Sequence, residues 1–182
     1  MNAILNASDG ELWERSVEFH GHSCPGLAIG YKAAVYAREL LGLGFSQDEE
    51  FVCVTETDAC GVDAISVVLG CSVGKGNLLF KLRGKQAFSF FNRNTGKSVR
   101  LVTREAQRNG RSREEAQRGI LAAPCGEMFD VKTPSFGLPE NARVFNSFVC
   151  ECCGEKTAEN YLRFEDGKKV CLDCFSSYSR FM

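Results

Sequence analysis

The sequence has little of several features that mark whole classes of protein. Its formal net charge is −1, so no overall field attracts the chain to nucleic acid or to an anionic membrane. No apolar run approaches the roughly 18 residues of a membrane-spanning helix. The N-terminal segment MNAILNASDGELWERS has neither the basic region nor the apolar core of a signal peptide. We therefore expect a cytoplasmic protein with no membrane contact and little affinity for nucleic acid.

Histidine is also scarce, because the chain has only two, and both lie in the segment FHGHSCPG at residues 19–26. Cysteine is abundant instead, with ten residues. Nothing in the sequence signals secretion, so a disulfide framework is not indicated. We interpret the cysteines as reduced thiols, several of which have the spacing of metal ligands.

Apolar periodicity and turn residues predict an α+β fold. Helices are expected over residues 8–19 and 27–44, through Ile65, Val68 and Leu69, and over residues 112–124. Strands are expected in FVCVTET, LLFKLRG, KQAFSFFNR and SVRLVTRE. In the third of these, Phe88 and Phe90 alternate with Ser89, which is typical of a strand with one buried face. The sequence thus predicts a mainly antiparallel sheet with packed helices.

The segment TPSFGLPENAR, at residues 133–143, contains two prolines and is the best candidate for a linker. We expect an α+β core domain over residues 1–147 and a small zinc-binding domain over residues 148–182. Neither part contains an internal repeat or a low-complexity segment.

The C-terminal region holds the strongest motif in the chain. Two C-x-x-C pairs are formed by Cys150, Cys153, Cys171 and Cys174. Their separation is typical of a structural zinc site with four thiolate ligands. A hairpin around an Asp-Gly turn is expected between the pairs and a short helix after the second, which together predict a treble-clef zinc finger. Cys152 offers an alternative to Cys153, although Gly154 favours Cys153 as the ligand.

A second group of metal-binding side chains is expected around FHGHSCPG. Its candidate ligands are His20, His22, Cys24 and Cys60. Imidazole and thiol ligands favour zinc, nickel or copper, so we predict a second transition-metal site. Cys60 precedes an expected helix, whose N-terminus favours the thiolate. The same residues suit catalysis, with Cys60 or Cys24 as the nucleophile and His22 as acid or base.

The remaining cysteines and the Gly-rich turn LGCSVGKGN carry weaker signals. Cys71 lies in that turn and is expected to be exposed, whereas Cys53 lies in an apolar strand and is expected in the core. The turn is too short for a P-loop, but Lys75 and nearby amides suit an anion. No role is predicted for Cys125.

The stretches HGHSCPGLAIGYKAA and ETDACGVDAISVVLGCSVGKGNLLFKLRGKQAFSFFNRNTGKSVR, followed by the cysteine finger, resemble the FmdE-like family, named after formylmethanofuran dehydrogenase. The resemblance implies an α+β core with a Cys/His-lined active site, an auxiliary treble-clef zinc finger and an intertwined homodimer. The family's motif residues fall on His20, His22, Cys24, Cys60, Asp63, Cys71, Lys75 and Asn77. We assign the last four of these to cofactor binding. Cys125 and Cys152 depart from the family pattern.

Three functions are consistent with these features. We favour a metal-binding accessory protein of a molybdenum- or tungsten-dependent one-carbon (formyl) oxidoreductase, assembled with that enzyme. The alternative is a stand-alone thiol- or metal-dependent enzyme that acts on a small substrate. The third is a zinc-finger regulator of nucleic acid, supported by Arg100, Arg104, Arg108 and Arg111 at helical spacing. The finger itself is not basic, which places the third function last.

Overall fold

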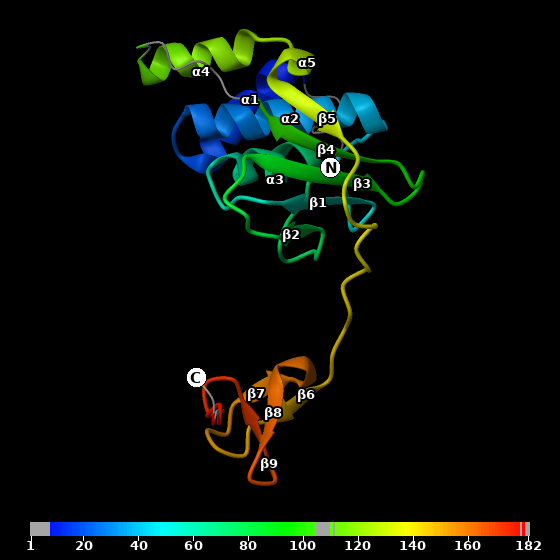
Figure 1. Cartoon of the computed structure of the whole chain (residues 1–182), viewed down its shortest axis with the longest axis vertical. Coiled ribbons are helices and arrows are strands. Elements are labelled where there is room, and N and C mark those ends of the chain that lie inside the picture. Colours follow the sequence, from blue (N-terminus) through cyan, green and yellow to red (C-terminus); the bar gives the residue numbers. More distant parts are fainter. Residues whose placement is uncertain (1–7, 105–109, 111, 179, 181–182) are drawn as a thin grey trace. The chain divides into compact units, whose positions relative to one another are not determined.

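The computed structural model describes residues 8–104, 110, 112–178 and 180. The chain divides into two compact units, Met1–Ala142 and Arg143–Met182. The boundary expected from the sequence, between residues 147 and 148, lies within the first part of the second unit. Each unit is described separately below, and both appear in Figure 1.

The first unit is built on a five-stranded sheet with the order β2-β1-β3-β4-β5. The strands are β1 (Phe51–Thr55), β2 (Leu78–Phe80), β3 (Ala87–Asn92), β4 (Ser98–Thr103) and β5 (Phe129–Lys132). Strands β1 and β2 pair in parallel, and the other three pairings are antiparallel. The prediction of a mainly antiparallel sheet is therefore confirmed.

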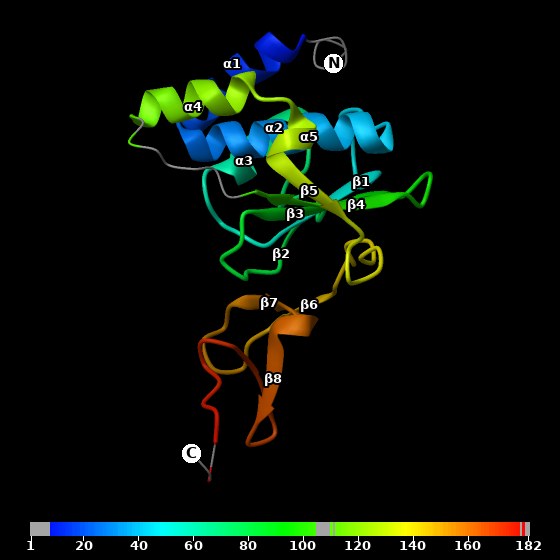
Figure 2. The same cartoon turned by 45° about the horizontal axis from the view of Figure 1, so that its top comes forward.

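The helices of this unit begin and end at residues that the sequence marks. They are α1 (Asp9–His20), α2 (Pro25–Leu41), α3 (Gly61–Leu69), α4 (Arg113–Ala122) and α5 (Cys125–Met128). Ser8 and Glu11 form a capping box at the start of α1, and Ser112 and Glu115 form another at α4. Figure 2 shows α1, α2 and α3 together on one side of the sheet, where their apolar faces form the main core.

Two glycines set how closely α2 and α3 pack. A Cβ atom built at Gly30 would lie 2.0 Å from the carbonyl oxygen of Gly61, so only glycine permits this approach. Near the helix starts, a Cβ at Gly26 would lie 3.4 Å from the Cβ of Cys60. The close crossing therefore brings the start of α3 beside the start of α2, where Cys24 is the N-cap.

The other face of the sheet is also covered, which the sequence analysis did not anticipate. All six residues of β3 are buried, including Ser89, so the prediction of a strand with one buried face is wrong. Phe136, from the segment expected to be a linker, packs on Phe91 with ring centroids 5.8 Å apart. Arg93 fixes the same segment by donating to the carbonyl oxygen of Pro139. Most of the predicted linker thus belongs to the first unit.

The second unit is a small arrangement of hairpins. Its elements are β6 (Ser147–Val149), β7 (Lys156–Ala158), η1 (Glu159–Tyr161), β8 (Leu162–Glu165) and β9 (Lys168–Cys171). Strands β8 and β9 form the predicted hairpin, with Asp166 (φ 48°) and Gly167 (φ 79°) in the left-handed conformation of its turn. The helix expected after Cys174 is not formed in residues 175–178. The unit therefore has the knuckle and hairpin of a treble clef without that helix in the described residues.

Within the described part of the chain, no helix combines the length and apolar character needed to cross a membrane.

Candidate metal centres

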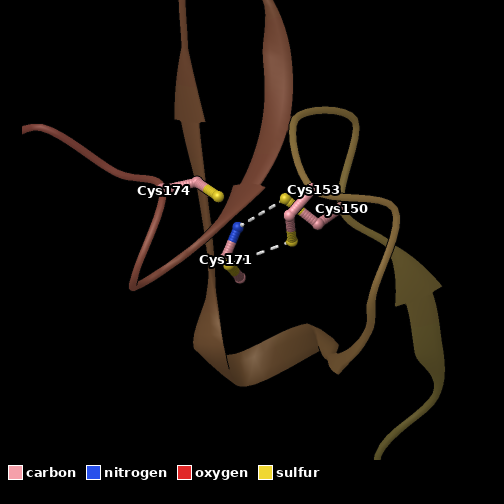
Figure 3. Close-up of side chains that lie close together, drawn as sticks. All are labelled: Cys150, Cys153, Cys171 and Cys174. Atoms are coloured by element: carbon pink, nitrogen blue, oxygen red, sulfur yellow. Dashed lines mark hydrogen bonds between the residues drawn. The ribbon is translucent and has the colours of Figure 1, made fainter.

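Four cysteine sulfurs gather in the second unit. The Sγ atoms of Cys150, Cys153, Cys171 and Cys174 all lie within 4.8 Å of one another (Figure 3). The Sγ atoms of Cys153 and Cys171 are 3.9 Å apart. Zinc–sulfur bonds of about 2.3 Å in a tetrahedron place sulfurs about 3.8 Å apart, so the donor set fits zinc. The structure groups Cys153, and not Cys152, with the other three.

Backbone amides support negative charge on the first of these sulfurs. The N–H of Cys171 donates to the Sγ of Cys150 over 3.3 Å. Hydrogen bonds from the backbone of Cys153 first, and then of Cys171, lower the pKa of the Cys150 thiol to about 6. In contrast, the side chains of Cys171 and Cys152 raise the pKa of Cys174. Cys152 is exposed and therefore lies at the edge of the cluster.

A second cluster forms where α1 ends and α2 begins. His20 is the last residue of α1, and Gly21 then turns the chain with a φ of 84°. This turn brings the ligand atoms of His20, His22 and Cys24 within 4.8 Å of one another. The two imidazole rings have centroids 4.5 Å apart. The predicted grouping of both histidines with Cys24 is therefore present in the fold.

His20 has one ring nitrogen engaged and the other unused. Its Nδ1 lies 2.7 Å from Oδ2 of Asp63, in the first turn of α3. Its Nε2 is buried and has no hydrogen-bond partner among the described residues. Buried polar atoms in proteins are almost always satisfied, so an unpaired nitrogen beside two other ligand groups needs an explanation.

Cys24 and Cys60 bring two thiols to the same place. Cys24 is 1% exposed, and its Sγ accepts the N–H of Leu27 over 3.3 Å as the N-cap of α2. Cys60 lies beside it, since the Cys24 side chain contributes to its titration. Burial, and then the neighbouring Cys24 thiol, raise the pKa of Cys60. The expectation that the helix N-terminus favours a thiolate at Cys60 is therefore wrong in direction.

The position of Cys60 also separates it from the tight cluster. Its sulfur does not lie within 4.8 Å of all three ligand atoms of His20, His22 and Cys24. It is thus a neighbour of that cluster on the Cys24 side. Its membership of the ligand set, predicted from the sequence, stays a prediction.

Three residues that we assigned to cofactor binding lie at the other end of α3. Cys60 precedes this helix and Cys71 follows it, and nine residues of helix span about 13 Å. Asn77 is fully buried and donates to the carbonyl oxygens of Asp48 and Phe51. Lys75 donates to the carbonyl oxygen of Ser46 over 2.8 Å. The structure therefore places Cys71, Lys75 and Asn77 away from the Cys/His cluster, in contacts that fix the loop before β1.

Two further cysteines have environments that differ in a simple way. Cys71 is 1% exposed, which corrects the expectation that it is accessible, and burial raises its pKa to about 12. Cys53 is completely buried, as predicted, and burial raises its pKa well above the usual value. The Cys125 thiol donates to the carbonyl oxygen of Lys32.

The arginines that supported a nucleic-acid interface do not form a helix face. Arg100 lies in β4 and forms an ion pair with Glu56, while Arg104 pairs with Asp130. Arg108 and Arg111 lie outside the described residues. The helical spacing on which this interpretation depended is therefore wrong for the first two.

Sequence reasoning did not identify how Asp63 acts, or the glycines that position the cluster. Asp63 contacts His20 from 43 positions away, and no local pattern signals such a pair. Gly30 and Gly61 carry no signal beyond their residue type. Only the crossing of α2 and α3 shows why they are required.

Comparison with known proteins agrees with this arrangement. Residues 19–129 match the family described as FmdE, molybdenum formylmethanofuran dehydrogenase operon. Residues 143–180 match the prokaryotic dksA/traR C4-type zinc finger. A solved structure, of an FmdE-like protein of tungsten formylmethanofuran dehydrogenase from Syntrophus aciditrophicus, has a TM-score of 0.66. It is 21% identical and covers 94% of each chain, so the likeness concerns the fold.

A curated relative is the probable S-adenosyl-L-methionine-binding protein of Archaeoglobus fulgidus. It is 30% identical over 196 residues, which cover 90% of this chain. The match covers 52% of the relative, so the chain spans about half of that protein's length. The FmdE match extends over more than half of the present chain and contains the whole Cys/His cluster. The protein therefore belongs to the FmdE family and carries a C-terminal C4 finger that binds zinc.

Proposed function

We propose that the protein is a cytoplasmic metal-binding accessory protein whose His20, His22 and Cys24 hold a second transition metal, distinct from the zinc of the finger. The observation that carries this proposal is the buried, unpaired Nε2 of His20. The family description and the name of the structural relative support a role beside a molybdenum or tungsten formyl oxidoreductase.

The contact between His20 and Asp63 supports a metal ligand rather than a simple ion pair. Metal-binding histidines commonly donate one ring N–H to a carboxylate, which fixes the ring and its tautomer. Asp63 accepts at Nδ1, so Nε2 is left as a lone-pair donor directed away from the carboxylate. His22 and Cys24 then supply the other two ligand atoms within 4.8 Å.

The donor set indicates which metal class suits the site. Two imidazoles and one thiolate favour zinc, nickel or copper over magnesium or calcium. Three protein ligands leave a coordination position for another group, unlike the closed four-thiolate finger. A metal bound there supplies a Lewis acid. Cys60, half-buried beside Cys24, is placed to fill the fourth position or to contact whatever does.

Metal stoichiometry tests the proposal directly. We expect two metal equivalents per chain when the protein is dialysed against zinc or nickel and analysed by mass spectrometry of the elements. The variants His22→Ala and Cys24→Ser should each lose one equivalent and retain the other. Ser23→Ala alters an exposed side chain between them and serves as the matched control.

A single equivalent in the unaltered chain would contradict the proposal, as would a second equivalent that persists in both ligand variants. Cys60→Ser then separates two arrangements. Loss of the second metal makes Cys60 a ligand, whereas retention with weaker binding makes it a neighbour.

We also propose that the protein acts as a homodimer, and that its physiological partner is the oxidoreductase complex. The small second unit exposes many large apolar side chains. They include Phe164 (74% exposed), Tyr178 (88%) and Val144 (101%). A unit of this size gains stability when such groups are covered by another chain.

A further inference from the structure

A charged cavity lies in the first unit, on the face of the sheet opposite helices α1–α3. Its volume is about 310 Å³, within the range of small-molecule sites. Four cationic side chains and one carboxylate line it, together with Ser135 and Phe136. The charged residues are Lys81, Arg83, Lys85, Arg100 and Glu56. Since the whole chain has a formal net charge of −1, the net charge of +3 at this cavity is a local concentration.

The carboxylate in the lining is already committed to one arginine. Arg100 donates from Nε to Oε1 of Glu56 over 2.6 Å and from Nη2 to Oε2 over 3.0 Å. Hydrogen bonds from Arg100 lower the pKa of Glu56, and Lys85 and Lys81 lower it further. The pair neutralises itself, so the charges of the other three cations remain to be balanced.

Backbone contacts hold those cations at the cavity. The N–H of Lys81 donates to the carbonyl oxygen of Thr55 over 2.8 Å, and the N–H of Arg83 donates to that of Glu56 over 2.9 Å. The ammonium of Lys81 lies 4.2 Å from the ring centroid of Phe136, which itself packs on Phe91. The segment that carries the cations therefore lies along the end of β1.

We propose that this cavity binds a small phosphate ester. Convergent cations repel one another in the empty cavity, and a dianion relieves that repulsion. The planar guanidinium of Arg83 suits the paired oxygens of a phosphate, and Lys81 and Lys85 add point charges. The buried hydroxyl of Ser89, on the same sheet face and paired in register with Arg100, has no partner among the described residues. It adds a polar group beneath the cavity floor.

This ligand site is separate from the Cys/His cluster. The cluster involves the first turns of α2 and α3, on the helix side of the sheet, whereas the cavity is lined by residues 81–85 and Ser135 on the other side. The inference therefore stands without the second metal, and its test can be separated from that of the metal.

Calorimetric titration with ribose 5-phosphate tests the site, at a pH above the second phosphate pKa of about 6. We expect a submillimolar dissociation constant for the unaltered chain and no measurable binding of ribose. The double variant Arg83→Gln/Lys85→Gln should bind about tenfold more weakly or worse, because two charge-assisted contacts are lost. Both side chains are exposed, so the variant should fold normally.

Lys97→Gln provides the matched control, since Lys97 is an exposed cation outside the cavity lining and should leave affinity within about twofold. His22→Ala should leave it unchanged, which separates this site from the metal. Equal weakening by Lys97→Gln would show attraction to charge in general and would overturn the proposal. Absence of binding to the unaltered chain, or tighter binding of malate than of ribose 5-phosphate, would overturn it as well.

Discussion

His20 and Asp63 join the end of α1 to the start of α3 through a 2.7 Å contact between Nδ1 and Oδ2. The His20 side chain is 12% exposed and that of Asp63 is 42% exposed, so the carboxylate shields the inner ring from solvent on one side. The contact fixes the imidazole plane and leaves Nε2 for a ligand. Asp63, which the family motif assigns to cofactor binding, is thus placed to position a metal ligand.

Replacing Asp63 tests this positioning role. Asp63→Asn should weaken the second metal by about 10- to 100-fold, because partners of metal-binding histidines contribute in that range. The finger zinc should be retained. Competition with a chromophoric chelator measures both affinities, and Asp58→Asn at an exposed site before α3 is the control. Unchanged affinity in Asp63→Asn would show that the carboxylate does not act through His20.

The contact of Gly30 with Gly61 predicts a severe effect of one added methyl group. Gly30→Ala would place a Cβ 2.0 Å from the carbonyl oxygen of Gly61, which forces α2 and α3 apart. We expect destabilisation of about 3 kcal/mol or more, measured by chemical unfolding. Gly74→Ala, where a Cβ meets nothing within 4 Å, should change stability little. Similar stabilities of the two variants would mean that the helices separate easily.

Local signals in the sequence predicted most of the elements. The capping boxes of Ser8 with Glu11 and Ser112 with Glu115 are complete within four residues, and both helices begin where they indicate. The short α5 and the edge strand β5 were missed, because four-residue elements carry too little periodicity. The double burial of β3 was missed for another reason. It depends on Phe136, which is distant in the sequence and was assigned to a linker.

The candidate sites divide in the same way. FHGHSCPG and the C-x-x-C pairs are local motifs, and the structure brings the ligand atoms of each together. The fates of Cys71 and Asn77 depend instead on the loop before β1, which closes over them. A Gly-rich turn predicts exposure only when nothing packs on it, and here the backbone oxygen of Phe51 accepts from both side chains.

The finger offers a test of which cysteine completes the zinc site. Cys153→Ser should release zinc and loosen the second unit, while the first unit stays folded, because the finger has little core of its own. Cys152→Ser, which replaces the sulfur of an exposed neighbour by oxygen, should keep the full zinc content. Elemental analysis and amide exchange measure the two effects. Zinc retained in Cys153→Ser and lost in Cys152→Ser would exchange their roles.

The proposed homodimer predicts a particle of twice the 20.1 kDa chain mass in light scattering. Phe164→Asp should shift it towards the monomer, because this ring is 74% exposed on the second unit. Val73→Asp changes a side chain that is 66% exposed on the first unit and should leave the mass unchanged. A stable 20.1 kDa particle for the unaltered chain at micromolar concentrations would contradict the dimer.

Two ion pairs of different burial predict how stability depends on pH. Hydrogen bonds from Arg100 lower the pKa of Glu56 below its ordinary value, and the Glu56 side chain is only 8% exposed. A carboxyl with a lowered pKa in the folded state stabilises the fold above its unfolded pKa. That stabilisation is lost as the pH falls through the folded pKa. Glu56→Gln should therefore lower the free energy of unfolding near neutral pH by about 1–3 kcal/mol, and the loss should shrink in acid.

Asp130→Asn is the matched control, since its pair with Arg104 is about half exposed and exposed pairs contribute little. Urea unfolding at several pH values from neutral to strongly acidic measures both variants against the unaltered chain. Equal effects of Glu56→Gln and Asp130→Asn at neutral pH would show that burial does not strengthen the Arg100 pair. A difference for Glu56→Gln that stays constant into acid would show that the loss comes from packing, because only an ionised Glu56 forms the charged pair that acid removes.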